Sequence, residues 1–476
     1  MIWSRFARLA LFLVPMLATG CTIHPIKPFS HACTFTRYNL EVEDPTSHPD
    51  AASFGSLVVS KVLRRPPGDS ATPNPSMLFL SGGSLHGAFG AGFLDAWKTM
   101  GDRKRSPSTS EQEAKAKAAL PDYPDFRVVT GISTGSILST FAFVGATDLA
   151  VKGYTIDAES DLLKPFGSVK NGEPGVDAYL KLLQKGALAD LSPLRDRLKS
   201  YMDDTMLRKV AAEGGRGRLL LIGVVDVDTG KAVVLDLTQM AQQYVDASSE
   251  TGRIAKRECY VEGIIASSSS PLAALPVFID DRMYIDGGAR FGMFTDEIGR
   301  KIEDLPPVAG DSQARPTIYL LINGNQEMGP KCGRVDGSKC PKGSDPPGTD
   351  VGDHADWSFL GLALRSENIL ANQVYRFSAD AVAKRADAKK MGFQLFKIEG
   401  DLPGHRYPRD ATTGLPMPDS KTCSEWHDVD REHGDPLQFY PQYMRCVIDY
   451  GRVKAQARLV ASPSAPGSTR PGNGPF

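Results

Sequence analysis

The sequence has almost no net charge, and its N-terminal apolar run is too short to cross a bilayer. Its 476 residues include 55 Lys and Arg against 56 Asp and Glu, which gives a formal net charge of −1 at pH 7. We therefore expect no nucleic-acid partner, because nucleic-acid-binding proteins present an excess of basic residues. No internal repeat is present. With 41% hydrophobic residues, the chain can bury a large core.

The N-terminal apolar run, Leu9 to Leu17, is typical of an export signal, because Arg5 and Arg8 precede it and small residues follow it. The stretch L-A-T-G-C that ends at Cys21 resembles a bacterial lipobox, with its leucine one position further from the cysteine than usual. We expect residues 1–20 to be a lipoprotein signal peptide. Lipidated Cys21 would then anchor the protein to a membrane of the bacterial cell envelope, facing the periplasm or the exterior. An ordinary secretory signal cut nearby is the alternative.

Cysteine is scarce, but its number is even once Cys21 is set aside from the total of seven. An even set suits an oxidising compartment. Closing a short loop costs less entropy than closing a long one, which favours pairs of near neighbours. The sequence therefore predicts the disulfides Cys332–Cys340 and Cys423–Cys446. Cys33–Cys259 would then join the N-terminal segment to the core.

Two short patterns resemble metal sites only weakly. Cys423, His427 and His433 lie close together, but their spacing matches no tight zinc pattern. The stretch D-V-D-T-G at 226–230 looks like the start of a calcium loop, but the expected ligands do not continue after it, and a hairpin turn explains it better. We expect no metal and no other cofactor.

Composition divides the rest of the chain into four parts. Residues 21–75 are expected to be an N-terminal extension ending in a proline-rich linker. Residues 76–400 alternate buried-type strands with helices, which predicts an α/β sandwich on a largely parallel sheet. Residues 401–460 are expected to be a C-terminal extension that is irregular apart from 443–460. Residues 461–476 are expected to be a disordered tail.

The stretch from Phe126 to Phe141 predicts a strand, a sharp turn and a helix. An apolar run leads into G-I-S-T-G, and small and apolar residues follow at helical spacing. Ser133 lies at the apex of this turn, where Gly131 and Gly135 permit a strained bend and close packing. Such a turn exposes a hydroxyl, which is a nucleophile only if the chain also supplies a base and an oxyanion site. The simpler interpretation is that Ser133 is a helix N-cap.

A second glycine-rich turn follows the strand expected at Met77 to Leu80 and precedes a helix expected from about Leu85 to Trp97. Glycines ahead of a helix leave backbone N–H groups free to face an anion. The amides of Gly82, Gly83 and Ser84 are therefore candidates for an oxyanion hole. A phosphate loop is the alternative, but the stretch lacks the G-x-x-x-x-G-K-[ST] spacing.

Three motifs in order resemble those of the patatin-like phospholipase family, which are G-G-G-x-[RK]-G, G-x-S-x-G and D-G-[GA]. They are S-G-G-S-L-H-G at 81–87, G-I-S-T-G at 131–135 and D-G-G at 286–288, and the motif glycines besides Gly82 and Gly83 are Gly87, Gly131, Gly135, Gly287 and Gly288. The resemblance extends over about Met77 to Glu399. It implies a three-layer α/β/α sandwich and a phospholipase A-like lipid acyl hydrolase. Ser133 would be the nucleophile and Asp286 the base, in a dyad without histidine.

Two residues depart from the family pattern. Ser84 replaces the third glycine, and a side chain there disfavours positive φ. His86 replaces the basic residue and could titrate near neutral pH, so it is also the alternative base. For Asp286, the simpler interpretation is an ordinary turn.

The resemblance implies a lipid or phospholipid substrate. Because of Ser84 and His86, a catalytically impaired envelope lipoprotein that binds lipid is one alternative function. A small-ester or thioester hydrolase is another.

Overall fold

A computed structural model of the chain describes residues 32–40, 57, 76–170, 173–294, 317–324, 359–388, 391–410, 412–434 and 436–460. Cys21, the predicted Cys332–Cys340 disulfide and residues 461–476 lie outside these ranges.

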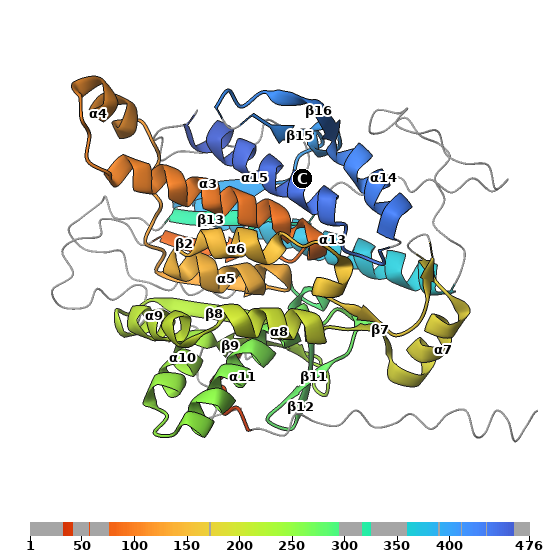
Figure 1. The fold of residues 1–476 in the computed structure, drawn as a ribbon. Helices are drawn as coiled ribbons and strands as arrows, with labels where there is room; N and C mark the ends of the chain where they lie inside the picture. Colours follow the sequence, from red (N-terminus) through yellow and green to blue (C-terminus); the bar gives the residue numbers. More distant parts are fainter. Residues whose placement is uncertain are drawn as a thin grey trace, which may run out of the picture.

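A mixed sheet with the strand order β1-β9-β8-β3-β2-β13-β14 forms the middle of the molecule (Figure 1). Its strands, with the paired β11 and β12, are β1 (Arg37–Asn39), β2 (Ser76–Leu80), β3 (Val128–Ile132), β8 (Leu219–Asp226), β9 (Lys231–Asp236), β11 (Val277–Ile279), β12 (Arg282–Asp286), β13 (Thr317–Ile322) and β14 (Gly392–Lys397). The strands from β8 to β14 in this order are parallel, whereas β9, β1 and the β11–β12 hairpin pair antiparallel. The prediction of a largely parallel central sheet is confirmed.

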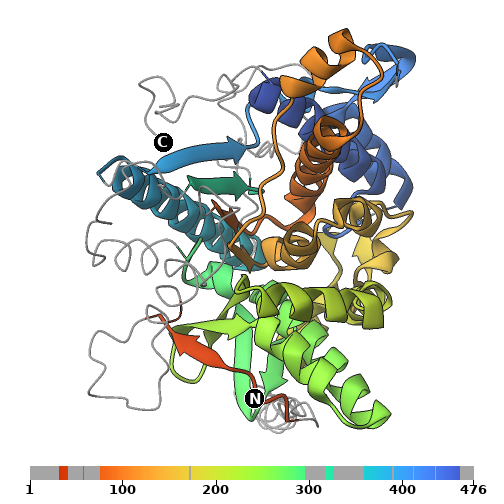
Figure 2. The same ribbon diagram turned by 90° about the vertical axis from the view of Figure 1, so that its left-hand side faces the viewer.

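Helices cover both faces of this sheet. Alternate side chains of β2 enter two apolar clusters, with Leu78 and Leu80 in one and Met77 and Phe79 in the other. The first cluster takes in α3, α5, α9, α10, α11 and α15, and the second takes in α13. Figure 2 shows α13, in teal, on the opposite side of β13 and β14 from the orange α3. The fold is therefore a three-layer α/β/α sandwich, and burial on both faces explains the continuous apolar run of β2.

The helices on these faces and around them have the following bounds: α3 (Gly87–Arg105), α4 (Glu111–Ala118), α5 (Thr134–Val144), α6 (Thr147–Tyr154), α7 (Val176–Lys185), α8 (Ser192–Tyr201), α9 (Asp204–Gly215), α10 (Leu237–Asp246), α11 (Glu250–Ser268), α13 (Phe359–Ala388), α14 (Cys423–Gly434) and α15 (Pro441–Val460). Short strands form three small sheets: β4 (Lys164–Pro165), β7 (Ala187–Asp190) and β10 (Leu272–Ala274) form one, β5 (Val169–Lys170) and β6 (Glu173–Pro174) another, and β15 (Arg406–Arg409) and β16 (Pro416–Thr422) the third. Among the described residues, no helix is both long and apolar enough to span a membrane.

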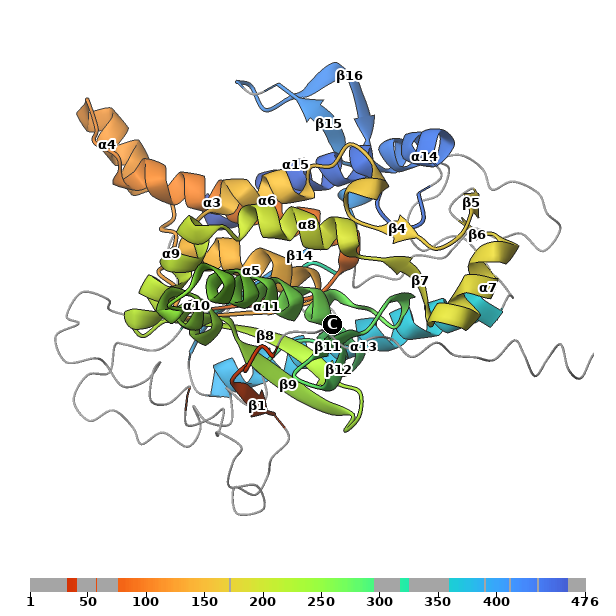
Figure 3. The same cartoon turned by 60° about the horizontal axis from the view of Figure 1, so that its bottom comes forward.

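The prediction of an irregular C-terminal extension is wrong between 406 and 434, where β15, β16 and α14 form. These elements lie beside α15, which runs along α3 (Figures 1 and 3). The α3 and α15 backbones approach closely, because a Cβ at Gly92 would lie 2.0 Å from the carbonyl oxygen of Ile448. The predicted Cys423–Cys446 disulfide is confirmed and joins α14 to α15. The charged sequence of α14 does not by itself predict a helix, because the helix is stabilised by its disulfide and by contacts with neighbouring elements.

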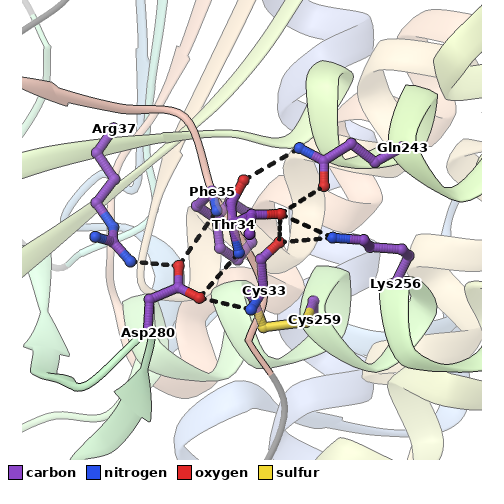
Figure 4. Close-up of a disulfide and its surroundings, with 8 residues drawn as sticks. All are labelled: Cys33, Thr34, Phe35, Arg37, Gln243, Lys256, Cys259 and Asp280. Atoms are coloured by element: carbon purple, nitrogen blue, oxygen red, sulfur yellow. Dashed lines mark hydrogen bonds and ion pairs between the residues drawn. A yellow bond between two sulfur atoms is a disulfide. The ribbon is translucent and has the colours of Figure 1, made fainter. Parts of the chain in front are cut away.

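The predicted disulfide Cys33–Cys259 is also confirmed, and it joins the N-terminal segment to α11 (Figure 4). The carboxylate of Asp280 accepts from the backbone N–H groups of Cys33, at 2.6 Å, and Thr34, at 2.9 Å. Asp280 belongs to the turn between β11 and β12, and Lys256 of α11 donates to the Cys33 carbonyl oxygen at 3.0 Å. The N-terminal segment therefore connects α11 with the hairpin that ends at Asp286.

Candidate active site

Ser133 lies between β3 and α5 with a backbone conformation that is rare outside glycine, φ 53° and ψ −126°. Hydroxyl groups hold this bend on both sides. The N–H of Ser133 donates to Ser267 Oγ at 3.0 Å, and its carbonyl oxygen accepts from Ser136 Oγ at 2.6 Å and from Ser268 Oγ at 3.2 Å. Ser133 stands at the N-cap position of α5, but its side chain makes no capping hydrogen bond. The N-cap interpretation therefore does not account for its hydroxyl.

The helix after the elbow touches the start of the predicted oxyanion loop. A Cβ at Gly135 would lie 2.3 Å from the carbonyl oxygen of Leu80 and 2.7 Å from that of Ser81. Only glycine permits this approach. The elbow and the loop after β2 are thus in direct contact.

Asp286 reaches the elbow through the register of the sheet. Ile132, the residue before Ser133, pairs with Gly223 of β8, and Asp286 pairs with Val224, the next residue of β8. Asp286 and Ile132 therefore occupy consecutive positions along the same edge of β8. The structure brings Ser133 and Asp286 to one place, although they lie far apart in the sequence.

The Asp286 side chain is buried and also caps the turn that follows it. Its Oδ1 accepts from the N–H of Gly288 at 2.7 Å, and its own N–H donates to the carbonyl oxygen of Ser269 at 2.9 Å. Asp286 therefore does stabilise the D-G-G turn, as the simpler interpretation expects. This does not conflict with a role as base, because a carboxylate accepts several hydrogen bonds.

The loop after β2 takes the conformation of a glycine-rich turn. Gly83 has φ 152°, and a Cβ there would lie 2.5 Å from the carbonyl carbon of Asn323. Ser84 has φ 51°, so the serine adopts the positive φ that its side chain disfavours. From the end of β13, Asn323 donates through its N–H to Ser81 Oγ and through Nδ2 to the Ser81 carbonyl oxygen, both at 2.9 Å.

Residues of the C-terminal extension contact the two departures from the family pattern. Gln438 donates through Nε2 to Ser84 Oγ at 2.5 Å. The segment that carries Gln438 is held by Glu159, whose carboxylate accepts from the N–H groups of 437–439 at 2.6–2.8 Å. The Nε2 atom of His86 pairs with the hydroxyl of Tyr443 at 3.1 Å.

The expectation that His86 titrates near neutral pH is wrong. Burial, aided by the nearby His427, lowers the pKa of His86 to about 4, and the hydrogen bond to the backbone of Gly83 only partly opposes the shift. The imidazole is therefore neutral at pH 7. It does not supply the positive charge of the family's basic residue.

Several residues that position the site carry no motif. The serine run just before the strands that lead to Asp286 includes Ser267, Ser268 and Ser269. Its place between an apolar helix and a predicted strand is the sequence feature that could have indicated these residues. Gln438 and Tyr443 had no sequence signal, because more than 350 positions separate each from the loop that it contacts. Among the described residues, no cluster of three His, Cys, Asp or Glu side chains could hold a metal ion.

Residues 78–297 match the family model of the patatin-like phospholipases. This stretch of the chain is similar to the patatin-like phospholipases. No curated protein matches the chain significantly. The patatin match begins in β2 and ends just after the D-G-G turn, well before Glu399, where the motif resemblance was expected to end. The match favours lipid acyl hydrolysis as the activity of this domain.

Replacing Ser267 by Ala should destabilise the strained bend at Ser133. The change removes the hydroxyl that accepts from the N–H of Ser133, and a buried donor without a partner costs about 1–3 kcal/mol. We expect a lower melting temperature and slower hydrolysis of lipid esters. Ser139→Ala is the matched control. Ser139 is equally buried, but its hydroxyl donates to the carbonyl oxygen of Ser136 and not to the bend at Ser133. An equal loss of activity in both variants would contradict the role of Ser267.

The lowered pKa of His86 predicts a pH-dependent stability. A folded-state pKa of about 4, below the ordinary 6.5, means that the unfolded chain binds this proton more tightly. The stabilising contribution is complete above about pH 6.5 and is lost as the pH falls towards about 4. At about pH 5, His86→Gln should remove roughly 2 kcal/mol of the acid-induced loss of unfolding free energy.

Chemical denaturation of the wild type and His86→Gln at neutral and acidic pH measures this difference. His427 and Tyr443 face the same ring and remain in both proteins. The exposed His433 supplies the control, since His433→Gln should keep the acid-induced loss of the wild type. The pKa assignment is wrong if His86→Gln loses as much stability in acid as the control.

Proposed function

We propose that this protein is a lipid-anchored phospholipase A-like enzyme that cleaves carboxylic esters through a Ser133–Asp286 dyad. The observation that carries the proposal is the adjacency of a strained serine elbow and a buried aspartate along one edge of β8. The family assignment supplies the lipid substrate class. No cofactor is required for this chemistry, because serine, carboxylate and backbone amides supply its parts.

In the first half of the reaction, Asp286 accepts the proton of the Ser133 hydroxyl while Oγ attacks the carbonyl carbon of the ester. The carbonyl oxygen becomes an oxyanion, which the amides of Gly82, Gly83 and Ser84 stabilise. The tetrahedral species collapses as the bond to the alcohol breaks. The proton on Asp286 passes to the leaving alkoxide, and the acyl group remains on Ser133.

In the second half, Asp286 accepts a proton from water, and the hydroxide attacks the acyl carbonyl. A second oxyanion forms in the same loop and collapses with release of the fatty acid. The proton returns from Asp286 to Ser133 Oγ, so the enzyme is regenerated. The conformation of the oxyanion loop supports this scheme, because Ser84 keeps a positive φ and its hydroxyl accepts a hydrogen bond from Gln438.

Ser133→Ala should lower hydrolysis of phospholipid vesicles and of p-nitrophenyl esters by about 10⁴-fold and abolish labelling by a fluorophosphonate. Asp286→Asn should lower both strongly, because the amide cannot accept the proton. Ser200→Ala, which changes an exposed serine in α8, should leave rate and labelling unchanged. Labelling that persists in Ser133→Ala would place the nucleophile at another residue. A rate on short soluble esters or thioesters far above that on vesicles would favour the small-ester alternative.

The anchor is a separate part of the proposal. Cleavage before Cys21 and acylation of its thiol would hold the enzyme beside its bilayer substrate. Intact-mass spectrometry of membrane-extracted protein should give a chain that begins at Cys21 and carries acyl groups. Cys21→Ser should move the protein to the soluble fraction with its esterase rate on soluble esters unchanged. An unmodified Cys21 in the membrane fraction would refute the anchor.

A further inference from the structure

Tyr375 of α13 is a buried tyrosine whose hydroxyl lies between the two loops of the candidate site. A Cβ at Gly82, in the oxyanion loop, would lie 2.1 Å from the Tyr375 hydroxyl oxygen and 3.0 Å from Ser133 Cβ. A Cβ at Gly288 would lie 2.8 Å from the same hydroxyl oxygen and 3.1 Å from Asp286 Oδ1. The phenol oxygen is therefore close to the nucleophile on one side and to the base on the other.

Glycines also enclose the rest of the Tyr375 side chain. A Cβ at Gly292 would lie 2.8 Å from Tyr375 Cδ1, and a Cβ at Gly324 would lie 3.8 Å from Cδ2. Gly292 follows the D-G-G turn, and Gly324 follows β13. The ring thus passes between loops that follow three different strands, and its hydroxyl is the part of the side chain nearest to Gly82 and Gly288. Tyr375 is 8% exposed.

We propose that Tyr375 is a positioning residue of the acyl-transfer site, whose hydroxyl holds the oxyanion loop and the Asp286 turn at the spacing that attack by Ser133 requires. A hydrogen bond in a buried space is stronger than in water and fixes its partners more firmly. Both loops carry groups that bear or stabilise negative charge during the proposed reaction, and a phenol O–H is a donor of the right polarity. The inference rests on the proposed function and adds to it a residue from outside the matched range 78–297.

Tyr375→Phe tests this role, because it keeps the ring between the glycines and removes only the hydroxyl. We expect kcat to fall by about 10- to 100-fold, since small displacements of reacting groups cost rates of this size. We expect KM to stay within about twofold, because the substrate-binding surface is unchanged. Tyr260→Phe is the matched control: it removes a buried hydroxyl bonded to Thr140 and should leave both constants unchanged.

The concentration of competent sites is measured by complete fluorophosphonate titration, so that any unfolded fraction is excluded from kcat. An unchanged kcat in Tyr375→Phe, or a loss no larger than in Tyr260→Phe, overturns the inference while leaving the proposed function intact. A rise in KM at constant kcat also overturns it and makes Tyr375 a binding residue. If the wild type neither labels at Ser133 nor hydrolyses esters, the proposed function fails, and the role of Tyr375 fails with it.

Discussion

The backbone conformation of Ser133 is the constraint on which the site depends. A non-glycine residue with φ 53° and ψ −126° costs on the order of 1–3 kcal/mol and persists only where its surroundings enforce it. Here the enforcement comes from hydrogen bonds, made by α5 and by the end of α11. Serine hydroxyls accept from the N–H of Ser133 and donate to its carbonyl oxygen, so both peptide groups of the bend are held in place. The strain keeps the side chain of Ser133 at the apex of the turn.

The same helix end supports both Ser133 and Asp286. Ser267 and Ser268, at the end of α11, bond to the Ser133 backbone, and the carbonyl oxygen of Ser269 accepts from the N–H of Asp286. A shift of this helix would therefore move both residues together rather than apart. The disulfide at Cys259 attaches α11 to the N-terminal segment, which in turn bonds to Asp280 in the hairpin before Asp286 (Figure 4). The Cys33–Cys259 disulfide thus links the helix end that holds Ser133 to the hairpin that ends at Asp286.

The parts of the site that could be predicted from the sequence are those whose shape is fixed locally. The elbow at Ser133 and the turn at Asp286 are short, glycine-marked and preceded by strands, so their residue types report their conformation directly. The environment of His86 could not be predicted, because its low pKa comes from burial against Tyr443 and His427, far away in the sequence. The same limit applies to Ser84. Its residue type argued against a positive φ, and the contact from Gln438 that accompanies this conformation spans 354 positions.

These long-range contacts share one property: they come from residues beyond the patatin match. Asn323 fixes the start of the oxyanion loop, Gln438 bonds to its serine, and Tyr375 passes between it and the Asp286 turn. The matched range 78–297 contains Ser133, Asp286 and the loop amides of Gly82 to Ser84, but it lacks β13 and β14, which pair in parallel beside β2. If the domain ended at residue 297, β2 would lie at an exposed edge of the sheet, and the loop after it would lack β13 and Asn323, which follows that strand. The proposed reacting groups thus lie within the matched range, whereas Asn323, Tyr375 and Gln438, which contact the loops around them, come from the rest of the chain.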